Sequence, residues 1–89
     1  MEFEVRKPDP GEIEERGIDQ WPVWEKEVSR FPWIYGETEE CYLLSGRVVV
    51  STDDGKSVEF GAGDIVRFPA GLRCRWDIKE AVKKHYRFK

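Results

Sequence analysis

Few side chains in this 89-residue sequence could do chemistry in a protected site: two cysteines, one histidine and a set of carboxylates. Glu39 and Cys41 stand two positions apart, so on a β-strand they would face the same side. A carboxylate in an apolar interior is a candidate general acid or base, because desolvation raises its pKa. A thiol needs a cationic neighbour to become a thiolate nucleophile. Arg73 and Arg75 flank Cys74 but would alternate to the opposite face, which weakens the case for an activated thiol.

Each of these residues also has a plainer interpretation. Buried cysteines often act as small apolar core residues. Glu39 could be a solvated residue at the end of a strand. His85 could transfer protons, or it could be a surface or hydrogen-bonded histidine. The residue types alone leave these alternatives open.

The elements that would position these residues are mainly short strands. Residues 3–6 are expected to form a strand, and residues 12–16 a helical turn with Asp9 as N-cap and Gly17 at its end. From Trp21 onward apolar runs alternate with turn residues, which is typical of a sandwich or barrel. We expect eight or nine strands and almost no helix, an all-β jelly-roll barrel. The expected strands lie within 21–28, 31–35, 41–44, 48–50, 58–60, 65–68, 72–78 and 82–88.

Turn chemistry marks where the chain should reverse. The segment 53–56, Asp-Asp-Gly-Lys, predicts a hairpin, since Asp-Gly tolerates positive φ. Gly46, Gly63 and Gly71 are expected at further reversals between strands. No linker divides the chain, so we expect one domain, with residues 1–20 as an N-terminal strand and turn segment and residues 21–89 as the barrel.

The composition narrows the class of protein. Charged residues make up 37% of the chain but both signs are mixed and the net charge is −3, which argues against nucleic acid as a partner. Such a charge-rich composition is also thermophile-like. With no apolar stretch long enough for a membrane span and no apolar leader, we expect a cytoplasmic protein without a membrane partner. In that compartment the two cysteines are expected to be free thiols.

Two segments resemble the conserved motifs of the cupin superfamily. Residues 39–46, EECYLLSG, match the pattern E-(six residues)-G. Residues 63–74, GDIVRFPAGLRC, match G-(five residues)-P-x-G-x-x-H, with Cys74 in place of the histidine. Together with segments 21–24, 68–76 and 82–86, these motifs look like the small single-domain cupins grouped with ureidoglycine aminohydrolase. The resemblance implies a jelly-roll barrel with any site in the barrel mouth.

The resemblance also implies which residues would form that site. In metal-binding cupins, three histidines and a glutamate converge inside the barrel. Here Glu39 takes the glutamate position and Cys74 that of the third histidine, while residues 32–35, where the other two would fall, contain none. The usual site is therefore not expected. Glu39 and Cys74 would lie on facing walls and are the catalytic candidates, and substrate-binding candidates are Tyr35, Cys41, Trp76, Lys84 and Tyr86.

A replacement metal site is a weaker possibility. Glu39, Cys41 and Cys74 could together hold zinc, iron or manganese, but they are one ligand short of a closed site. No cofactor is therefore assigned from the sequence.

The resemblance suggests a small nitrogen-bearing or carboxylate metabolite as ligand, and a non-redox, ureidoglycine aminohydrolase-like or isomerase-like reaction with Glu39 as acid or base. The alternatives are a non-catalytic ligand-binding or sensor barrel and a purely structural dimer. A homodimer is expected in either case, because Trp21, Trp24 and Trp33 suit an interface and both faces of the strand around Tyr42 are apolar.

Overall fold

The computed structural model describes residues 3–88. Its N-terminal part contains strand β1 (Glu4–Arg6), helix α1 (Pro10–Arg16) and the short 3-10 helix η1 (Ile18–Gln20). The Asp9 side chain accepts a hydrogen bond from the backbone N–H of Glu12 at 2.9 Å, and Gly17 ends the helix with φ of 65°. The predicted helical turn, its N-cap and its terminating glycine are thus confirmed.

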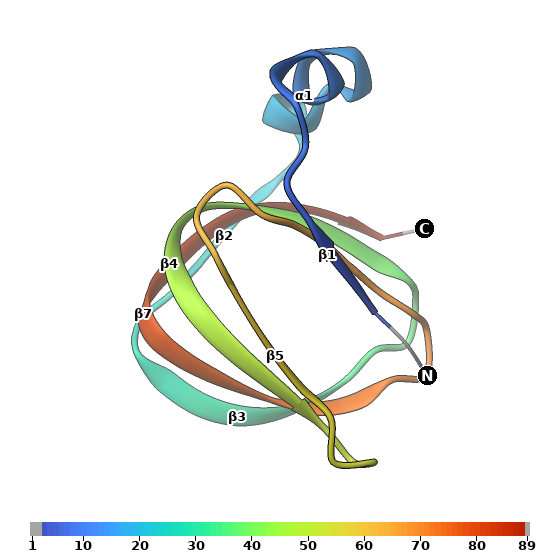
Figure 1. Ribbon diagram of the computed structural model, residues 1–89, viewed down its shortest axis with the longest axis vertical. Helices are drawn as coiled ribbons and strands as arrows, with labels where there is room; N and C mark the ends of the chain where they lie inside the picture. Colours follow the sequence, from blue (N-terminus) through green and yellow to red (C-terminus); the bar gives the residue numbers. More distant parts are fainter. Residues whose placement is uncertain (1–2, 89) are drawn as a thin grey trace.

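The rest of the chain forms antiparallel strands that curl into a barrel, with α1 outside it (Figure 1). The sheet order is β1-β6-β4-β7-β2, while β3 pairs with β7 and β5 with β4. This arrangement confirms the all-β prediction. The strands are β2 (Val23–Lys26), β3 (Ser29–Ile34), β4 (Glu39–Thr52), β5 (Ser57–Gly61), β6 (Ile65–Phe68) and β7 (Arg73–Phe88).

The described residues form seven strands, fewer than the expected eight or nine. The predicted strands 41–44 and 48–50 are one strand, β4, and 72–78 and 82–88 are one strand, β7. The expectation of a chain reversal at Gly46 is therefore wrong. Gly46 lies inside β4, where the register with β7 shifts, and has φ of 99°. A bulge of this kind bends a strand without ending it.

The other predicted turns are confirmed. Residues 53–56 connect β4 to β5 in a hairpin, with Gly55 at φ of 87°. Gly63 (φ of 88°) and Gly71 (φ of 86°) lie in the turns before β6 and β7. Each glycine adopts a conformation that costs an L-residue free energy.

Aromatic side chains dominate the barrel interior. Tyr35 and Phe68 stack with ring centroids 4.8 Å apart, and Phe60 and Trp76 meet edge to face at 5.7 Å. Phe68 also contacts Phe60 and Trp76. Such large rings bury much apolar area in a short chain, which stabilises a core of this size.

Ion pairs around Glu40 connect α1 to the barrel. Glu40, buried at the start of β4, accepts hydrogen bonds from Arg16 at 2.6 Å and from Arg87 at 3.1 Å. The ring of Trp21 lies near both guanidinium groups, 5.5 Å from that of Arg16 and 4.6 Å from that of Arg87. These contacts join the N-terminal segment to the last strand.

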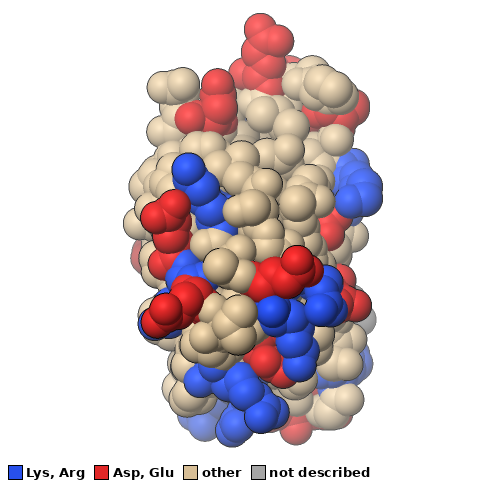
Figure 2. Space-filling model, turned by 90° about the vertical axis from the view of Figure 1, so that its left-hand side faces the viewer, with Lys and Arg blue, Asp and Glu red and all other residues tan. Residues whose placement is uncertain are grey.

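Figure 2 shows the face at the left of Figure 1, where lysine, arginine, aspartate and glutamate side chains are intermixed over the lower half, an uncharged area lies above the centre, and acidic groups lie at the α1 end. Ion pairs of Arg47 with Glu59 and Glu80 lie on the outer side of this barrel wall. Among residues 3–88 no helix is long and apolar enough to cross a membrane.

Candidate functional site

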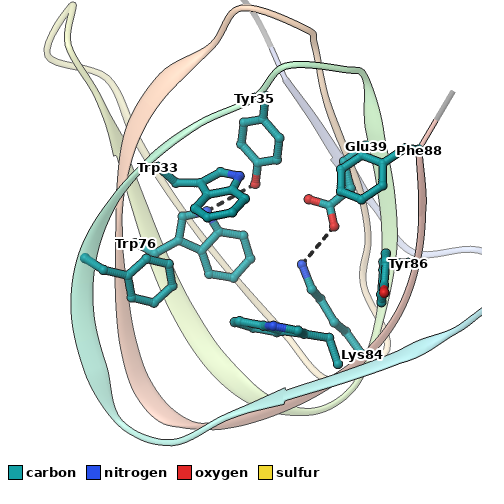
Figure 3. Close-up of a pocket in the computed structure, with 9 residues that line it drawn as sticks. Trp33, Tyr35, Glu39, Trp76, Lys84, Tyr86 and Phe88 are labelled. Carbon is teal, nitrogen blue, oxygen red and sulfur yellow. Dashed lines mark hydrogen bonds and ion pairs between the residues drawn. The ribbon is translucent and has the colours of Figure 1, made fainter.

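A cavity of about 230 Å³ opens at one end of the barrel, and its walls are mostly aromatic (Figure 3). Strands β2, β3, β4 and β7, with the loop after β3, supply the lining. The lining residues are Trp24, Phe31, Trp33, Tyr35, Glu39, Trp76, Lys84, Tyr86 and Phe88. The cavity therefore combines apolar walls with a small number of polar groups, as ligand sites usually do.

The polar centre of the cavity is an ion pair between Glu39 and Lys84. The Lys84 ammonium donates a hydrogen bond to Glu39 Oε2 at 3.0 Å, and the two residues are 4% and 5% exposed. Glu39 begins β4, whereas Lys84 pairs with Leu43 further along that strand. Figure 3 shows the two side chains reaching toward each other within the cavity.

The Lys84 ammonium also makes cation–π contacts with two tryptophans. Lys84 Nζ lies 4.7 Å from the ring centroid of Trp76 and 4.9 Å from that of Trp24. The faces of aromatic rings attract cations, and most strongly where water is excluded. The ammonium is thus fixed by one carboxylate and two ring faces.

Tyr35 and Trp76 form a second polar contact in the cavity. The indole Nε1–H of Trp76 donates to the Tyr35 hydroxyl oxygen at 3.1 Å. Burial raises the pKa of Tyr35 far above its usual value, and the nearby negative charge of Glu39 acts in the same direction. Tyr35 is therefore a neutral hydroxyl at any physiological pH.

The two cysteines are free thiols buried in the hydrophobic core, and neither lines the cavity. Cys74 Sγ lies 3.6 Å from the backbone carbonyl oxygen of Trp33, as a weak hydrogen-bond donor. Burial raises the pKa of Cys74 to about 11 and that of Cys41 to about 12. Both groups are protonated near neutral pH, which does not favour thiolate chemistry.

The weak metal proposal for Glu39, Cys41 and Cys74 requires correction. Within residues 3–88, no group of three or more His, Cys, Asp or Glu side chains could hold a metal ion. The Glu39 carboxylate is paired with an ammonium, whose charge opposes a metal cation at the same oxygen. The residues present therefore do not fit a cupin-type metal site, and no reaction step is derived through one.

Four of the five expected substrate-binding residues line the cavity: Tyr35, Trp76, Lys84 and Tyr86. Cys41, the fifth, lies outside the lining with no exposed area. Of the catalytic candidates, Glu39 lines the cavity and Cys74 does not.

Sequence reasoning missed four lining residues, Trp24, Phe31, Trp33 and Phe88. Alternation in steps of two from Tyr35 and from Tyr86 would have found Phe31, Trp33 and Phe88. Trp24 could not be found in this way, because its place depends on the pairing of β2 with β7 opposite Lys84.

His85 alternates to the other face of β7. Its Nδ1 lies 2.9 Å from the backbone oxygen of Trp21, and it is outside the cavity lining. Of the two interpretations of His85, the structure therefore agrees with a hydrogen-bonded histidine.

The sequence and the structure of this chain were compared with those of known proteins. The EutQ-like cupin domain profile matches residues 13–86. A DUF861-family protein of Thermotoga maritima is 49% identical, over 99% of this chain and 100% of that one, with a TM-score of 0.97. No curated protein matches the sequence.

More distant structures share the fold. The EutQ protein of Clostridium difficile is 20% identical, with a TM-score of 0.66 over 92% of this chain and 64% of that one. A putative ethanolamine utilization protein EutQ of Salmonella typhimurium is 18% identical, with a TM-score of 0.64 over 94% and 66% of the two chains. The present chain thus spans about two thirds of these EutQ proteins, and the likeness to them is one of fold.

Proposed function

This chain belongs to the EutQ-like cupin family, and on that premise we propose that it binds a small polar metabolite in the mouth of its barrel. The observation that carries the proposal is the buried Glu39–Lys84 ion pair inside an aromatic cavity. Desolvating two charges costs free energy that a core of apolar residues would avoid. An ion pair that also lines a cavity is better explained by ligand binding than by stability.

The size of the cavity limits the ligand. Sites for drug-sized molecules enclose roughly 300–1,000 Å³, whereas this cavity encloses about 230 Å³. The ligand is therefore a small metabolite, nitrogen-bearing or carboxylate, that places its polar atoms against Glu39 and Lys84. Tyr86 and Trp76 supply apolar wall, and Tyr35 a hydroxyl.

Glu39 is the residue proposed to act on the ligand, as acid or base in a non-redox reaction. Its carboxylate lies in the cavity and its position is fixed by Lys84. A positioned carboxylate within reach of a ligand proton can accept that proton in the transition state. Cys74 is proposed to shape the site only by its contact with Trp33. This reaction, whether ureidoglycine aminohydrolase-like or isomerase-like, therefore has no covalent step on sulfur.

A second candidate function is a non-catalytic ligand-binding or sensor barrel. The observation that favours it is that the Lys84 ammonium contacts both the Glu39 carboxylate and the faces of two indole rings. These contacts restrain the positions of both charged groups. A restrained ion pair suits recognition as well as proton transfer. Turnover of a bound ligand, lost in Glu39→Gln, would distinguish the enzyme from the binder.

We also propose that the chain forms a homodimer in the cytoplasm. Val23, Val28 and Ile34 on and beside the edge strands β2 and β3 are 48–63% exposed, which supports an interface there. The expected interface residues Trp24 and Trp33 line the cavity instead. Free thiols are consistent with a reducing compartment.

Tryptophan fluorescence offers a direct test of binding, because three of the four tryptophans line the cavity. We expect a member of a panel of small amides, ureas, amines and carboxylates to shift the emission and raise the unfolding temperature. Trp76→Phe and Lys84→Met should abolish both effects. The matched control Lys83→Met changes an exposed neighbour on the opposite face of β7 and should leave them intact. A panel without any binder would refute the proposal.

A further inference from the structure

Two arginines at the start of β7, Arg73 and Arg75, carry charges that the described fold does not neutralise. From their surroundings we infer that the outer wall of the barrel at this point docks an acidic segment of a partner protein. The docking surface, which we call the arginine face, consists of six exposed residues: Pro32, Ile34, Ser51, Ser57, Arg73 and Arg75. It is separate from the cavity, because none of its residues lines that cavity.

Strand alternation turns both arginines away from the core. Cys74 and Trp76, at alternate positions of β7, are buried. Arg73 and Arg75 therefore point outward, and both are exposed. Helix α1 lies at the opposite end of the molecule from β3 and the start of β7 (Figure 1). It leaves this part of the wall uncovered.

The cross-strand neighbours of the two arginines carry no charge. In the sheet register Arg75 lies between Pro32 of β3 and Ser51 of β4. Arg73 lies opposite Ile34 of β3. Within residues 3–88 neither arginine forms an ion pair. Both guanidinium groups are therefore free to bind an anion from outside the chain.

Other arginines of the same wall have an acidic partner across the sheet. Arg30 forms an ion pair with Asp77, which lies opposite it in the register. Arg47 does the same with Glu80. Opposite charges in such positions stabilise a sheet, and like charges destabilise it. The arginine face departs from this pattern.

Two acidic residues close to the arginines in sequence do not compensate them. Asp77, two positions after Arg75, pairs with Lys79 at 2.7 Å and with Arg30 at 3.8 Å. These cations, chiefly Lys79, lower the pKa of Asp77. Asp53, in the hairpin after β4, forms no ion pair within residues 3–88. The positive charge of the arginine face is thus available to a partner.

The uncompensated charge has a cost in the isolated chain. Two residues on one face of a strand are about 7 Å apart, which is within the Debye length of about 8 Å at physiological ionic strength. Arg73 and Arg75 therefore repel each other. An acidic partner would remove this repulsion and would accept paired hydrogen bonds from the guanidinium groups.

A protein segment fits this face better than a nucleic acid does. Nucleic acids bind through many phosphate contacts, whereas this face offers two arginines on a chain with a net charge of −3. Ile34, which is 61% exposed, and Pro32 lie beside the arginines. Arginine is enriched in protein interfaces, whose centres are apolar. The partner segment therefore presents carboxylates that flank an apolar side chain.

The arginine face does not suit a two-fold contact with a second copy. A dimer centred on it would bring the arginines of one copy against those of the other, and like charges in an interface oppose association. The homodimer proposed above uses the edge of β2 and β3, with Ile34 at the border between the two surfaces. Val23 of that edge pairs with His85, at the far end of β7 from Arg75. A dimer centred there leaves the arginines accessible.

Short peptides test the inference by NMR. Nitrogen-15-labelled protein is titrated with peptides of repeated Glu-Leu-Glu or Glu-Phe-Glu, and with matched peptides in which glutamine replaces every glutamate. We expect an acidic peptide to shift the amide signals of Ser51, Arg73 and Arg75, and to bind at least about tenfold more tightly than its glutamine counterpart. Added salt should weaken this binding by screening the charges. No binding, or equal binding of the glutamine peptide, would overturn the inference.

Variants that each remove one positive charge locate the contact. Arg73→Gln and Arg75→Gln should each weaken binding of the acidic peptide at least about fivefold. Arg30→Gln is the matched control, because Arg30 already has an acidic partner, and its affinity should stay within about twofold of the wild type. Equal losses in all three variants would show that only net charge matters and would overturn the inference. Thermal unfolding of each variant checks that it is folded.

Two further measurements address the alternative occupants. Tighter binding of a single-stranded DNA oligonucleotide than of every peptide, lost in Arg75→Gln, would replace the protein partner by a nucleic acid. Sedimentation that shows wild-type chains associating and Arg75→Glu chains not associating would show that a second copy covers the face. Either result would overturn the inference. Because the arginine face lies outside the cavity, its failure would leave the proposed ligand site untouched.

Discussion

The ammonium of Lys84 and the carboxylate of Glu39 meet at 3.0 Å although their backbones pair with different partners, Leu43 and Phe88 respectively. The two side chains point toward each other within the cavity (Figure 3), and both are buried. The bulge that shifts the register of β4 against β7 begins just beyond Leu43. The contact thus depends on the pairing of the two longest strands.

This ion pair should show strong coupling in unfolding. Removing one partner leaves a buried charge unpaired, so we expect Glu39→Leu and Lys84→Met each to lower the free energy of unfolding by about 3 kcal/mol. The double variant should lose much less free energy of unfolding than the two single variants lose together, because no buried charge remains unpaired in it. Urea denaturation of the wild type, the two single variants and the double variant measures this double-mutant cycle. Additive losses would show that the charges do not interact.

Gly46 should be the glycine least tolerant of substitution. Its φ is 99°, and a β-carbon there would lie 2.8 Å from Val82 Cα and still closer to the Ala81 carbonyl oxygen. Gly55 also has positive φ, but a β-carbon there would meet nothing within 4 Å. We expect Gly46→Ala to cost about 3 kcal/mol or more and Gly55→Ala about 1 kcal/mol, measured by urea denaturation. Equal costs would mean that the bulge relaxes freely.

The thiols should be inert in the folded protein. With a pKa of about 11, Cys74 is only about one-thousandth thiolate at pH 8, and Cys41, with a pKa of about 12, still less. We expect iodoacetamide to modify both at least about a hundredfold more slowly than in guanidinium, as followed by mass spectrometry. Rapid alkylation of native Cys74 would restore it as a candidate nucleophile.

Glu12 should make folding sensitive to acid. Its pKa falls from 4.5 to about 2, chiefly through hydrogen bonds from Arg6, with Arg16 contributing as well. A lowered pKa in the folded state means that the stabilisation is present above pH 4.5 and is lost as the pH falls toward 2. The unfolding temperature of the wild type should therefore drop over this range.

Glu12→Gln isolates that contribution. The variant should melt below the wild type at pH 6, and the difference should shrink as the pH approaches 2. Glu15→Gln, which changes an exposed glutamate of the same helix, is the control and should parallel the wild type throughout. A constant difference between wild type and Glu12→Gln would indicate that Glu12 does not titrate in this range.

The sequence was sufficient for the fold class, the hairpin at residues 53–56 and the N-cap of α1, because these depend on local turn chemistry and alternation. It was not sufficient to predict the conformation of the chain at Gly46, which lies in a bulge inside β4 and not at a chain reversal. Glycine permits a reversal and a bulge alike, and the difference lies in whether β7 continues alongside. The two long strands could not be derived without that pairing.

The positions of some cavity-lining residues were predicted where alternation and the motif sufficed. Glu39, Lys84 and Tyr86 share one interior because strands fix the face of each side chain. The partner of Glu39 could not be predicted, because Lys84 lies 45 positions away in the sequence. The cupin motif placed Cys74, and not Lys84, opposite Glu39. The contact requires the register between β4 and β7, which only the folded sheet defines.

Strand β7 pairs with β2, β3 and β4 along its sixteen residues. During synthesis, β2 and β3 emerge from the ribosome long before the strand to which each of them bonds. Their edges, with the exposed Val28 and Ile34 nearby, remain open until β7 is made. Closure of the barrel therefore has to wait for β7, and slow elongation through residues 73–88 would lengthen the time during which the open edges of β2 and β3 can aggregate.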